Sequence, residues 1–245
     1  MQKETLDLIT LAIDTCEARG SIALRQDGLA VARAAHKAGT DYSEWLLCAV
    51  RQVLHSAAAR MESIELLAVA TGPGSFTGVR VGLTTVKAWA EVYGKPVVGV
   101  SRLEALARST KNEVGPIAAS YDAQRGQVFG GLYCGLSGRL AKVGDEQVIA
   151  PGAFLEWVRK QAGDRTVSWV SLDPELITGL SAWQERTERG DTMLRSPEEL
   201  ADTVGWIAEE RAGAGEYIGP LDLDANYVRR SDAEIFWRGP AAHAK

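Results

Sequence analysis

Two aspartates and one glycine-rich turn are the residues of this chain whose types and spacing could do chemistry. Asp14 and Asp122 each end an apolar run, and each precedes an Arg-Gly turn into a second apolar run. The segment TGPGSFTG at 71–78 follows another apolar run and precedes a periodic segment, which predicts a strand, a tight turn and a helix. A turn at a helix N-terminus presents unpaired backbone N–H groups that can hold an anion. The candidate phosphate or nucleotide positions are Asp14, Thr15, Gly72, Gly74, Ser75, Thr77 and Asp122.

An alternative explanation of the turn is purely structural. Gly-Pro-Gly is also what a tight strand-to-helix connection needs, and the segment matches neither established phosphate-loop pattern. Backbone N–H groups approach a phosphate most easily where small residues follow the aspartate, but Asp14 is followed by Thr-Cys-Glu and Asp122 by Ala-Gln-Arg. Glu17 would repel a phosphate. We therefore predict that both aspartates mainly organise their turns by accepting local backbone hydrogen bonds.

The helix predicted after the turn carries two apolar faces. One face holds Val79, Leu83, Val86, Ala90 and Tyr93, and the other holds Val81, Ala88, Trp89 and Val92. Only one face is needed to cover a sheet, so the second face is predicted to contact a partner. The preceding helix adds Leu47, which lies off its own apolar stripe. The expected partner interface is Leu47, Arg80, Val81, Thr84, Thr85, Ala88, Trp89 and Val92.

Composition limits the class of protein. The 245 residues carry a formal net charge of -5, which argues against a broad nucleic-acid-binding face. Cys16, Cys48 and Cys134 are too scattered for a disulfide framework or a zinc site. No basic leader precedes the first apolar run, and no run approaches the length of a membrane span. We expect a cytoplasmic protein that does not contact a membrane.

The order of the elements predicts an α/β protein with two tandem domains, 1–111 and 112–245. Both domains open with strand, aspartate, Arg-Gly turn and strand, which suggests duplication. Strands are predicted at 6–15, 21–25, 29–35, 66–70, 97–100, 117–121, 127–133 and 167–172, with a less regular stretch at 143–149. Helices are predicted at 41–57, 79–92, 103–110, 154–161 and from Ser196, as a cap, to about residue 210. A returning tail is predicted at 220–230, and the domain boundary at 112–116.

Several motifs together resemble one known family. They are AIDT at 12–15, TGPGSFTGVRVGL at 71–83, VSRLEALA at 100–107, DAQRGQVF at 122–129 and YVRRSDAE at 227–234. In these segments the chain resembles the bacterial YeaZ family, also called TsaB, of tRNA threonylcarbamoyladenosine biosynthesis proteins. The resemblance implies two actin-like (ribonuclease H-like) domains, each a mixed sheet flanked by helices. It also implies a non-catalytic subunit that partners the transferase TsaD and the ATPase TsaE, dimerises in isolation and meets tRNA only through the complex.

Departures from the TsaD pattern limit the chemistry that is expected. TsaD-type proteins carry a metal-binding His-x-x-x-His, and the matching positions here are Arg102 and Leu106, which cannot ligate a metal in that way. We therefore expect no catalytic residue, no metal and no tightly bound cofactor, with ATP or ADP held, if at all, at an interface of the complex. The alternatives are a stand-alone actin-like kinase or peptidase, and a scaffold that only associates with itself.

Overall fold

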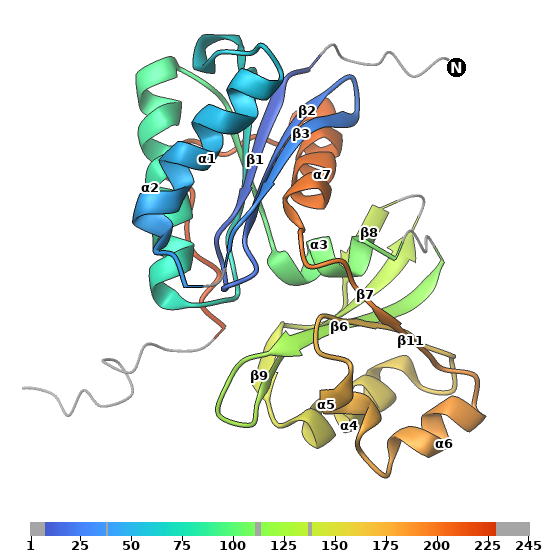
Figure 1. Ribbon diagram of the computed structural model, residues 1–245. Coiled ribbons are helices and arrows are strands. Elements are labelled where there is room, and N and C mark those ends of the chain that lie inside the picture. Colours follow the sequence, from blue (N-terminus) through green and yellow to red (C-terminus); the bar gives the residue numbers. More distant parts are fainter. Residues whose placement is uncertain (1–7, 38, 111–113, 137–138, 229–245) are drawn as a thin grey trace, which may run out of the picture.

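A computed structural model describes residues 8–37, 39–110, 114–136 and 139–228, which form an N-terminal and a C-terminal half (Figure 1). Parts of some predicted features lie outside the described residues. They are the first residues of the strand predicted at 6–15, part of the boundary at 112–116, and the tail beyond Val228 with most of the YVRRSDAE motif.

The first sheet has the strand order β3-β2-β1-β4-β5. Its strands are β1 (Thr10–Asp14), β2 (Ser21–Gln26), β3 (Leu29–Ala35), β4 (Leu66–Ala70) and β5 (Val97–Val100). β1 and β4 are buried along their whole length, as expected for central strands covered on both faces. β1 is antiparallel to β2 and parallel to β4, with Asp14 opposite Ser21 at the hairpin end.

The second sheet repeats this arrangement, in the order β11-β10-β6-β7-β8. Its strands are β6 (Gly115–Asp122), β7 (Val128–Leu136), β8 (Arg139–Lys142), β9 (Gln147–Ile149), β10 (Ser168–Ser171) and β11 (Thr192–Arg195). β6 is antiparallel to β7 and parallel to β10, as β1 is to β2 and β4. Within the less regular stretch at 143–149, only β9 is a strand; β8 ends before it at Lys142, and both strands pair with β7. The shared strand order supports the predicted duplication.

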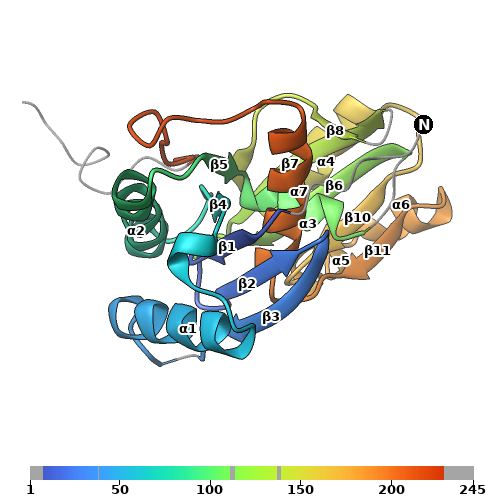
Figure 2. The same ribbon diagram turned by 90° about the horizontal axis from the view of Figure 1, so that it is seen from above.

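Helices cover both faces of the first sheet. α1 (Tyr42–Ser56) and α2 (Phe76–Tyr93) pack on one face, and α7 (Ala201–Gly213) packs on the other (Figure 2). The buried positions of α1 recur at helical spacing, as predicted: Leu46, Ala49, Val50, Val53 and Leu54. The remaining helical segments are η1 (Met61–Ser63), α4 (Pro151–Ala162), α5 (Glu175–Thr178) and α6 (Trp183–Glu188).

Two helices each pack on the sheet of the other half. α3 (Arg102–Arg108) follows β5 of the first sheet but packs on β6 and β7 of the second. α7 follows β11 of the second sheet but packs on β1, β2 and β4 of the first. The helix that was assigned by sequence to the domain 112–245 therefore covers the N-terminal sheet. Periodicity identifies an apolar helix face, but it does not say which sheet that face will meet.

The start of α7 also differs from the prediction. Ser196 does not cap the helix; its hydroxyl donates to the Pro197 carbonyl, and α7 begins at Ala201 after Leu200. The backbone N–H of Ala201 is satisfied from the other half, by the hydroxyl of Ser21 at 3.1 Å. Among the described helices, none combines the length and apolar character that crossing a membrane requires.

Candidate functional site at the two aspartate hairpins

Asp14 lies at the buried end of β1 and uses both of its carboxylate oxygens. Oδ1 accepts the backbone N–H of Cys16 at 3.0 Å, which is the local turn bond that the sequence predicts. Oδ2 accepts Nε–H of Arg102, the first residue of α3, at 2.8 Å. Both side chains are fully buried. The carboxylate is therefore occupied by a turn bond and an ion pair.

Arg102 is a fully buried cation that pairs with two carboxylates. Its Nη2 lies 2.9 Å from Oε1 of Glu17, and its guanidinium carbon lies 4.8 Å from the ring centroid of Tyr121. Burial by itself lowers the pKa of an arginine, but the charges of Asp14 and Glu17 outweigh burial and raise the pKa of Arg102 well above its ordinary value. The position that corresponds to a metal ligand in TsaD-type sequences therefore holds a permanent, paired positive charge.

Arg19 continues this network from the N-terminal half to the C-terminal half. Its Nε donates to Oε1 of Glu17 at 2.9 Å, and its two terminal nitrogens donate to the carboxylate of Asp173 at 3.0 and 3.1 Å. Burial tends to raise the pKa of Asp173, whereas the hydrogen bonds from Arg19 and from the Asp122 backbone lower it, and the net shift is downward. Alternating charges thus connect the two hairpins: Asp14, Arg102, Glu17, Arg19 and Asp173.

Asp122 makes the same local bond as Asp14 but has different surroundings. Oδ1 accepts the backbone N–H of Gln124 at 2.7 Å, and Oδ2 accepts the Gln124 side-chain amide at 2.8 Å. The predicted local turn bond is therefore present at both aspartates, and Asp14 adds an ion pair that the sequence did not predict. Asp122 is half-buried, and both of its carboxylate oxygens accept hydrogen bonds from Gln124 within the same turn.

The glycine-rich turn packs directly against the first hairpin. Ser75 caps α2 by accepting the N–H of Gly78 at 3.0 Å, and its own backbone N–H donates to the Cys16 carbonyl at 2.6 Å. A Cβ added at Gly74 would lie 2.2 Å from that same carbonyl, and one at Gly78 would lie 2.1 Å from the Thr15 carbonyl. These glycines are therefore required by the approach of the chain's own backbone. Thr77 is exposed and does not cap the helix.

Five of the expected phosphate positions thus come together, whereas Thr77 and Asp122 lie apart from them, and phosphate binding at these positions stays a prediction. Asp14, Thr15, Gly72, Gly74 and Ser75 are held against one another or against Arg102, whose backbone N–H donates to the Gly72 carbonyl at 2.7 Å. Glu17 places a carboxylate beside them. The residues present do not fit a nucleotide phosphate with its metal. Leu106 is in the apolar core, and the described part of the chain contains no cluster of three or more His, Cys, Asp or Glu that could hold a metal.

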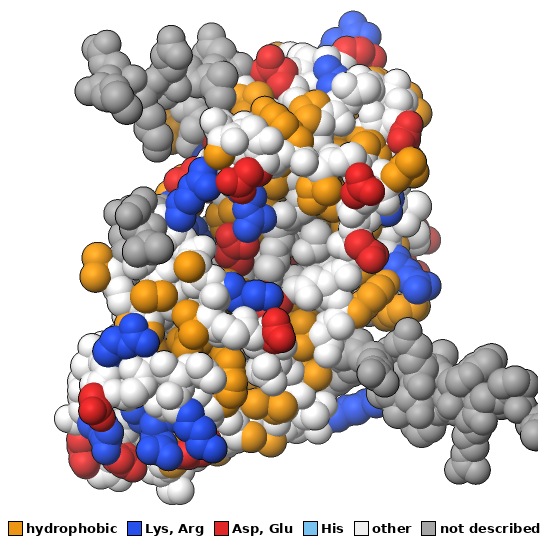
Figure 3. Space-filling model, turned by 180° about the vertical axis from the view of Figure 1, so that it is seen from behind, with side chains coloured by type: hydrophobic (Ala, Val, Ile, Leu, Met, Phe, Trp, Pro, Cys, Tyr) orange, Lys and Arg blue, Asp and Glu red, His pale blue; other side chains and the backbone are white. Residues whose placement is uncertain are grey.

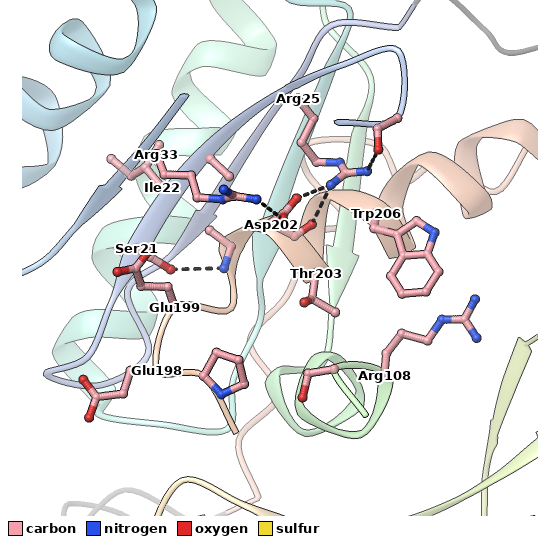
Figure 4. Close-up of a pocket in the computed structure, with 15 residues that line it drawn as sticks. Ser21, Ile22, Arg25, Arg33, Arg108, Glu198, Glu199, Asp202, Thr203 and Trp206 are labelled. Atoms are coloured by element: carbon pink, nitrogen blue, oxygen red, sulfur yellow. Dashed lines mark hydrogen bonds and ion pairs between the residues drawn. The ribbon is translucent and has the colours of Figure 1, made fainter. Parts of the chain in front are cut away.

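A cavity of about 840 Å³ lies elsewhere, between the first sheet, α7 and the end of α3 (Figure 4). Its cations are already paired: Asp202 lies between Arg25 and Arg33, and Arg108 pairs with Glu210 and stacks on Trp206 at 4.2 Å. Glu198 and Glu199 are exposed at its wall. This cavity therefore offers no unpaired cation for an anionic ligand.

A groove of about 490 Å³ between α1 and α2 contains much of the expected partner interface. The predicted residues that line it are Leu47, Arg80, Val81, Thr84 and Thr85. Leu47 is 56% exposed, whereas Val81 is half-buried against the core. Further along α2, Ala88 is exposed, Trp89 is half-buried and Val92 is 75% exposed. The second apolar face of α2 is thus partly open, and its contact with a partner stays a prediction.

The surface seen from behind carries acidic and basic side chains interspersed over both halves (Figure 3). This face has no broad basic patch, in agreement with the negative net charge.

Sequence reasoning missed the ion pairs that connect the hairpins and a buried carboxylate, Glu146. Glu146 accepts hydrogen bonds from Ser101, Tyr133 and Asn226, each at 2.5 Å. The signal for the Asp14 pair was present, because Arg102 follows an apolar strand and opens an apolar helix, where an arginine needs a buried partner. Glu146 carried no comparable signal, since its donors come from three distant segments.

Comparisons with known proteins point to tRNA threonylcarbamoyladenosine biosynthesis proteins. A family model described as TsaD, tRNA N6-adenosine threonylcarbamoyltransferase, matches residues 35–172. The tRNA threonylcarbamoyladenosine biosynthesis protein TsaB of Bacillus subtilis is 30% identical over 231 residues, covering 93% of this chain and 96% of the relative. A Pseudomonas aeruginosa protein described as similar to peptidase YeaZ has a crystal structure that superposes with a TM-score of 0.73 at 25% identity, covering 91% of this chain and all of that one. Component A of (R)-2-hydroxyglutaryl-CoA dehydratase from Acidaminococcus fermentans shares the fold alone, with a TM-score of 0.53 at 11% identity over 84% of this chain and 99% of that one.

Proposed function

Because the chain belongs to the TsaB family of tRNA threonylcarbamoyladenosine biosynthesis proteins, we propose that it is the non-catalytic subunit that binds and supports the transferase TsaD. In this proposal the chain contributes a binding surface, and TsaD contributes the chemistry. The complex places a threonylcarbamoyl group on the adenosine beside the anticodon of tRNAs that read codons beginning with A. The cytoplasmic location expected from the sequence stays a prediction.

The buried pair of Arg102 with Asp14 is the observation that carries the non-catalytic part. A catalytic group must reach substrate, but these two side chains have no exposed surface and are committed to each other. Thr15 and Cys16 close the same region by packing on the glycine turn. We therefore propose that ATP or ADP, where the assembly holds it, lies at an interface of the complex and is not enclosed between the hairpins of this chain.

The groove between α1 and α2 supports the partner-binding part. The TsaD family model matches a segment that includes both helices, so a TsaD-type subunit has the corresponding pair. Two such pairs can pack face to face about an approximate two-fold axis, and two copies of this chain can do so about an exact one. We propose that the groove binds TsaD in the complex and a second copy in its absence. TsaE then binds the complex of this chain with TsaD, and this chain contacts tRNA only as part of that complex.

Reconstitution tests the proposal. Threonylcarbamoyl transfer to unmodified tRNA is measured with this chain alone, with TsaD and TsaE, and with all three proteins. We expect transfer only in the third mixture. Transfer by this chain alone would contradict the non-catalytic role, and full transfer without it would contradict the supporting role.

A further inference from the structure

The segment after α7, here called the C-terminal strap (residues 218–228), runs along the edge strand β5 of the first sheet to the residue that follows β4. It begins where the backbone N–H of Ile218 donates to Val97 at 2.9 Å. Leu223 is fully buried in the first core, and the backbone N–H of Asn226 donates to the Thr71 carbonyl at 2.8 Å. The strap therefore has a fixed path that leads it to the glycine turn.

Asn226 anchors the strap to both halves. Its side-chain amide donates to Oε2 of Glu146 at 2.5 Å, and Glu146 is 9% exposed. On the other side, a Cβ at Gly72 would lie 3.0 Å from the Asn226 carbonyl, so the strap lies close to the turn. Because two contacts hold Asn226, the direction of the next residue is also set.

Tyr227 is directed onto the first turns of α2. Its ring stacks on Phe76 with 5.4 Å between centroids and 29° between planes. Nε of Arg80 donates to the Tyr227 hydroxyl at 2.9 Å, and the Arg80 guanidinium carbon lies 3.6 Å from the Phe76 ring centroid. Phe76 and Arg80 line the α1–α2 groove, and Tyr227, which does not line it, contacts both of them. These three residues form one cluster at the end of the groove.

Arg80 has no carboxylate within 4.0 Å among the described residues, although the groove-facing surface around it is otherwise apolar and hydroxylated. Its bond to Tyr227 orients the guanidinium, and no described carboxylate supplies a counter-ion for its charge. An unpaired cation at the end of an apolar groove favours a helix with an apolar stripe and an acidic side chain at the matching end.

We propose that Tyr227 is a positioning residue for partner binding: it fixes Phe76 and Arg80 as the end wall of the groove, where Arg80 meets a carboxylate on a TsaD helix. This inference rests on the proposed function, and it makes the C-terminal strap part of the interface. Losing the Tyr227 ring releases Phe76 and Arg80 into several rotamers, which must be ordered again on binding.

The test measures the affinity of this chain for purified TsaD by titration calorimetry. Tyr227→Ala should weaken binding roughly tenfold or more, as expected for loss of an ordered anchor. Tyr227→Phe keeps the ring stack and should stay within about threefold of the original affinity. The matched control is Tyr217→Ala, which removes an exposed tyrosine from a site before the strap and should leave affinity unchanged. Equal affinities for Tyr227→Ala and Tyr217→Ala would overturn the proposal.

A second measurement addresses the carboxylate. Arg80→Gln should lower the affinity and flatten its dependence on salt concentration, because one ion pair is removed from the interface. An unchanged salt dependence would overturn this part. Leu47→Glu distinguishes failure of the groove proposal from failure of the strap proposal. If Leu47→Glu leaves TsaD binding intact, the groove is not the binding site. If Leu47→Glu abolishes TsaD binding and Tyr227→Ala does not weaken it, the groove is the binding site and the strap has no role in it.

Discussion

The first and second aspartate hairpins have the same strand arrangement and the same local turn bond, yet their surroundings differ. Asp14 is buried, holds the guanidinium of Arg102 and packs beneath the glycine turn. Asp122 is half-buried, and its second oxygen is satisfied by its own neighbour Gln124. The comparison teaches that a repeated motif fixes the shape of a turn, while the segments packed on it decide whether a ligand could enter. Here the first hairpin is closed by the chain itself.

The largest expected effect comes from breaking the buried pair. Arg102→Met removes the side-chain partner of Asp14 and leaves a buried, uncompensated carboxylate, so the free energy of unfolding should fall by about 3–5 kcal/mol. Gln124→Met makes the corresponding change at the second hairpin and should cost less than about 1.5 kcal/mol, because Asp122 is accessible to water. Urea unfolding of both variants measures the difference. Equal losses would show that the two hairpins are equivalent.

The second effect comes from the glycine contacts. Gly78→Ala places a Cβ against the Thr15 carbonyl and should lower the free energy of unfolding by about 1–3 kcal/mol through overpacking. Gly152→Ala, at the start of α4 in the C-terminal half, meets no atom within 4 Å and should leave stability unchanged or raise it by up to about 1 kcal/mol. Thermal unfolding distinguishes the two. A harmless Gly78→Ala would mean that the turn is not packed as described.

The smallest effect concerns the connection between the hairpins. The pKa of Asp173 is lowered in the folded chain, so its contribution to stability is present above its unfolded pKa and is lost as pH falls through the folded value. Because the Arg19–Asp173 pair is partly exposed, Asp173→Asn should cost only about 0.2–1 kcal/mol near pH 7. The cost should shrink on acidification below about pH 4, as measured by urea unfolding across pH. A cost that stays constant down to pH 2 would contradict the ionic role of Asp173.

The sequence predicted the features that depend on residues close together in the chain, and it missed those that depend on distant residues. The hairpins, the glycine turn, α1 and α2 are specified by neighbours in the chain, and their pattern predicted them. The partner of Asp14 is 88 residues away and that of Arg19 is 154 residues away, so spacing could not pair them. The sequence also did not predict that α3 and α7 each pack on the sheet of the other half, because those contacts join distant segments. The sequence showed that Arg102 stands where TsaD-type proteins have a metal ligand. Its ion pair with Asp14 could be seen only in the structure.

The most direct test of the central claim compares one hairpin variant with one groove variant in reconstituted threonylcarbamoyl transfer with TsaD and TsaE. Asp122→Asn changes the half-buried aspartate of the second hairpin, and Leu47→Glu places a charge in the α1–α2 groove. Gln161→Glu on the exposed face of α4 is the control for added charge. The account predicts that Asp122→Asn and Gln161→Glu retain full transfer, whereas Leu47→Glu folds normally but loses TsaD binding and transfer together. Loss of transfer in Asp122→Asn, with normal transfer in Leu47→Glu, would contradict it.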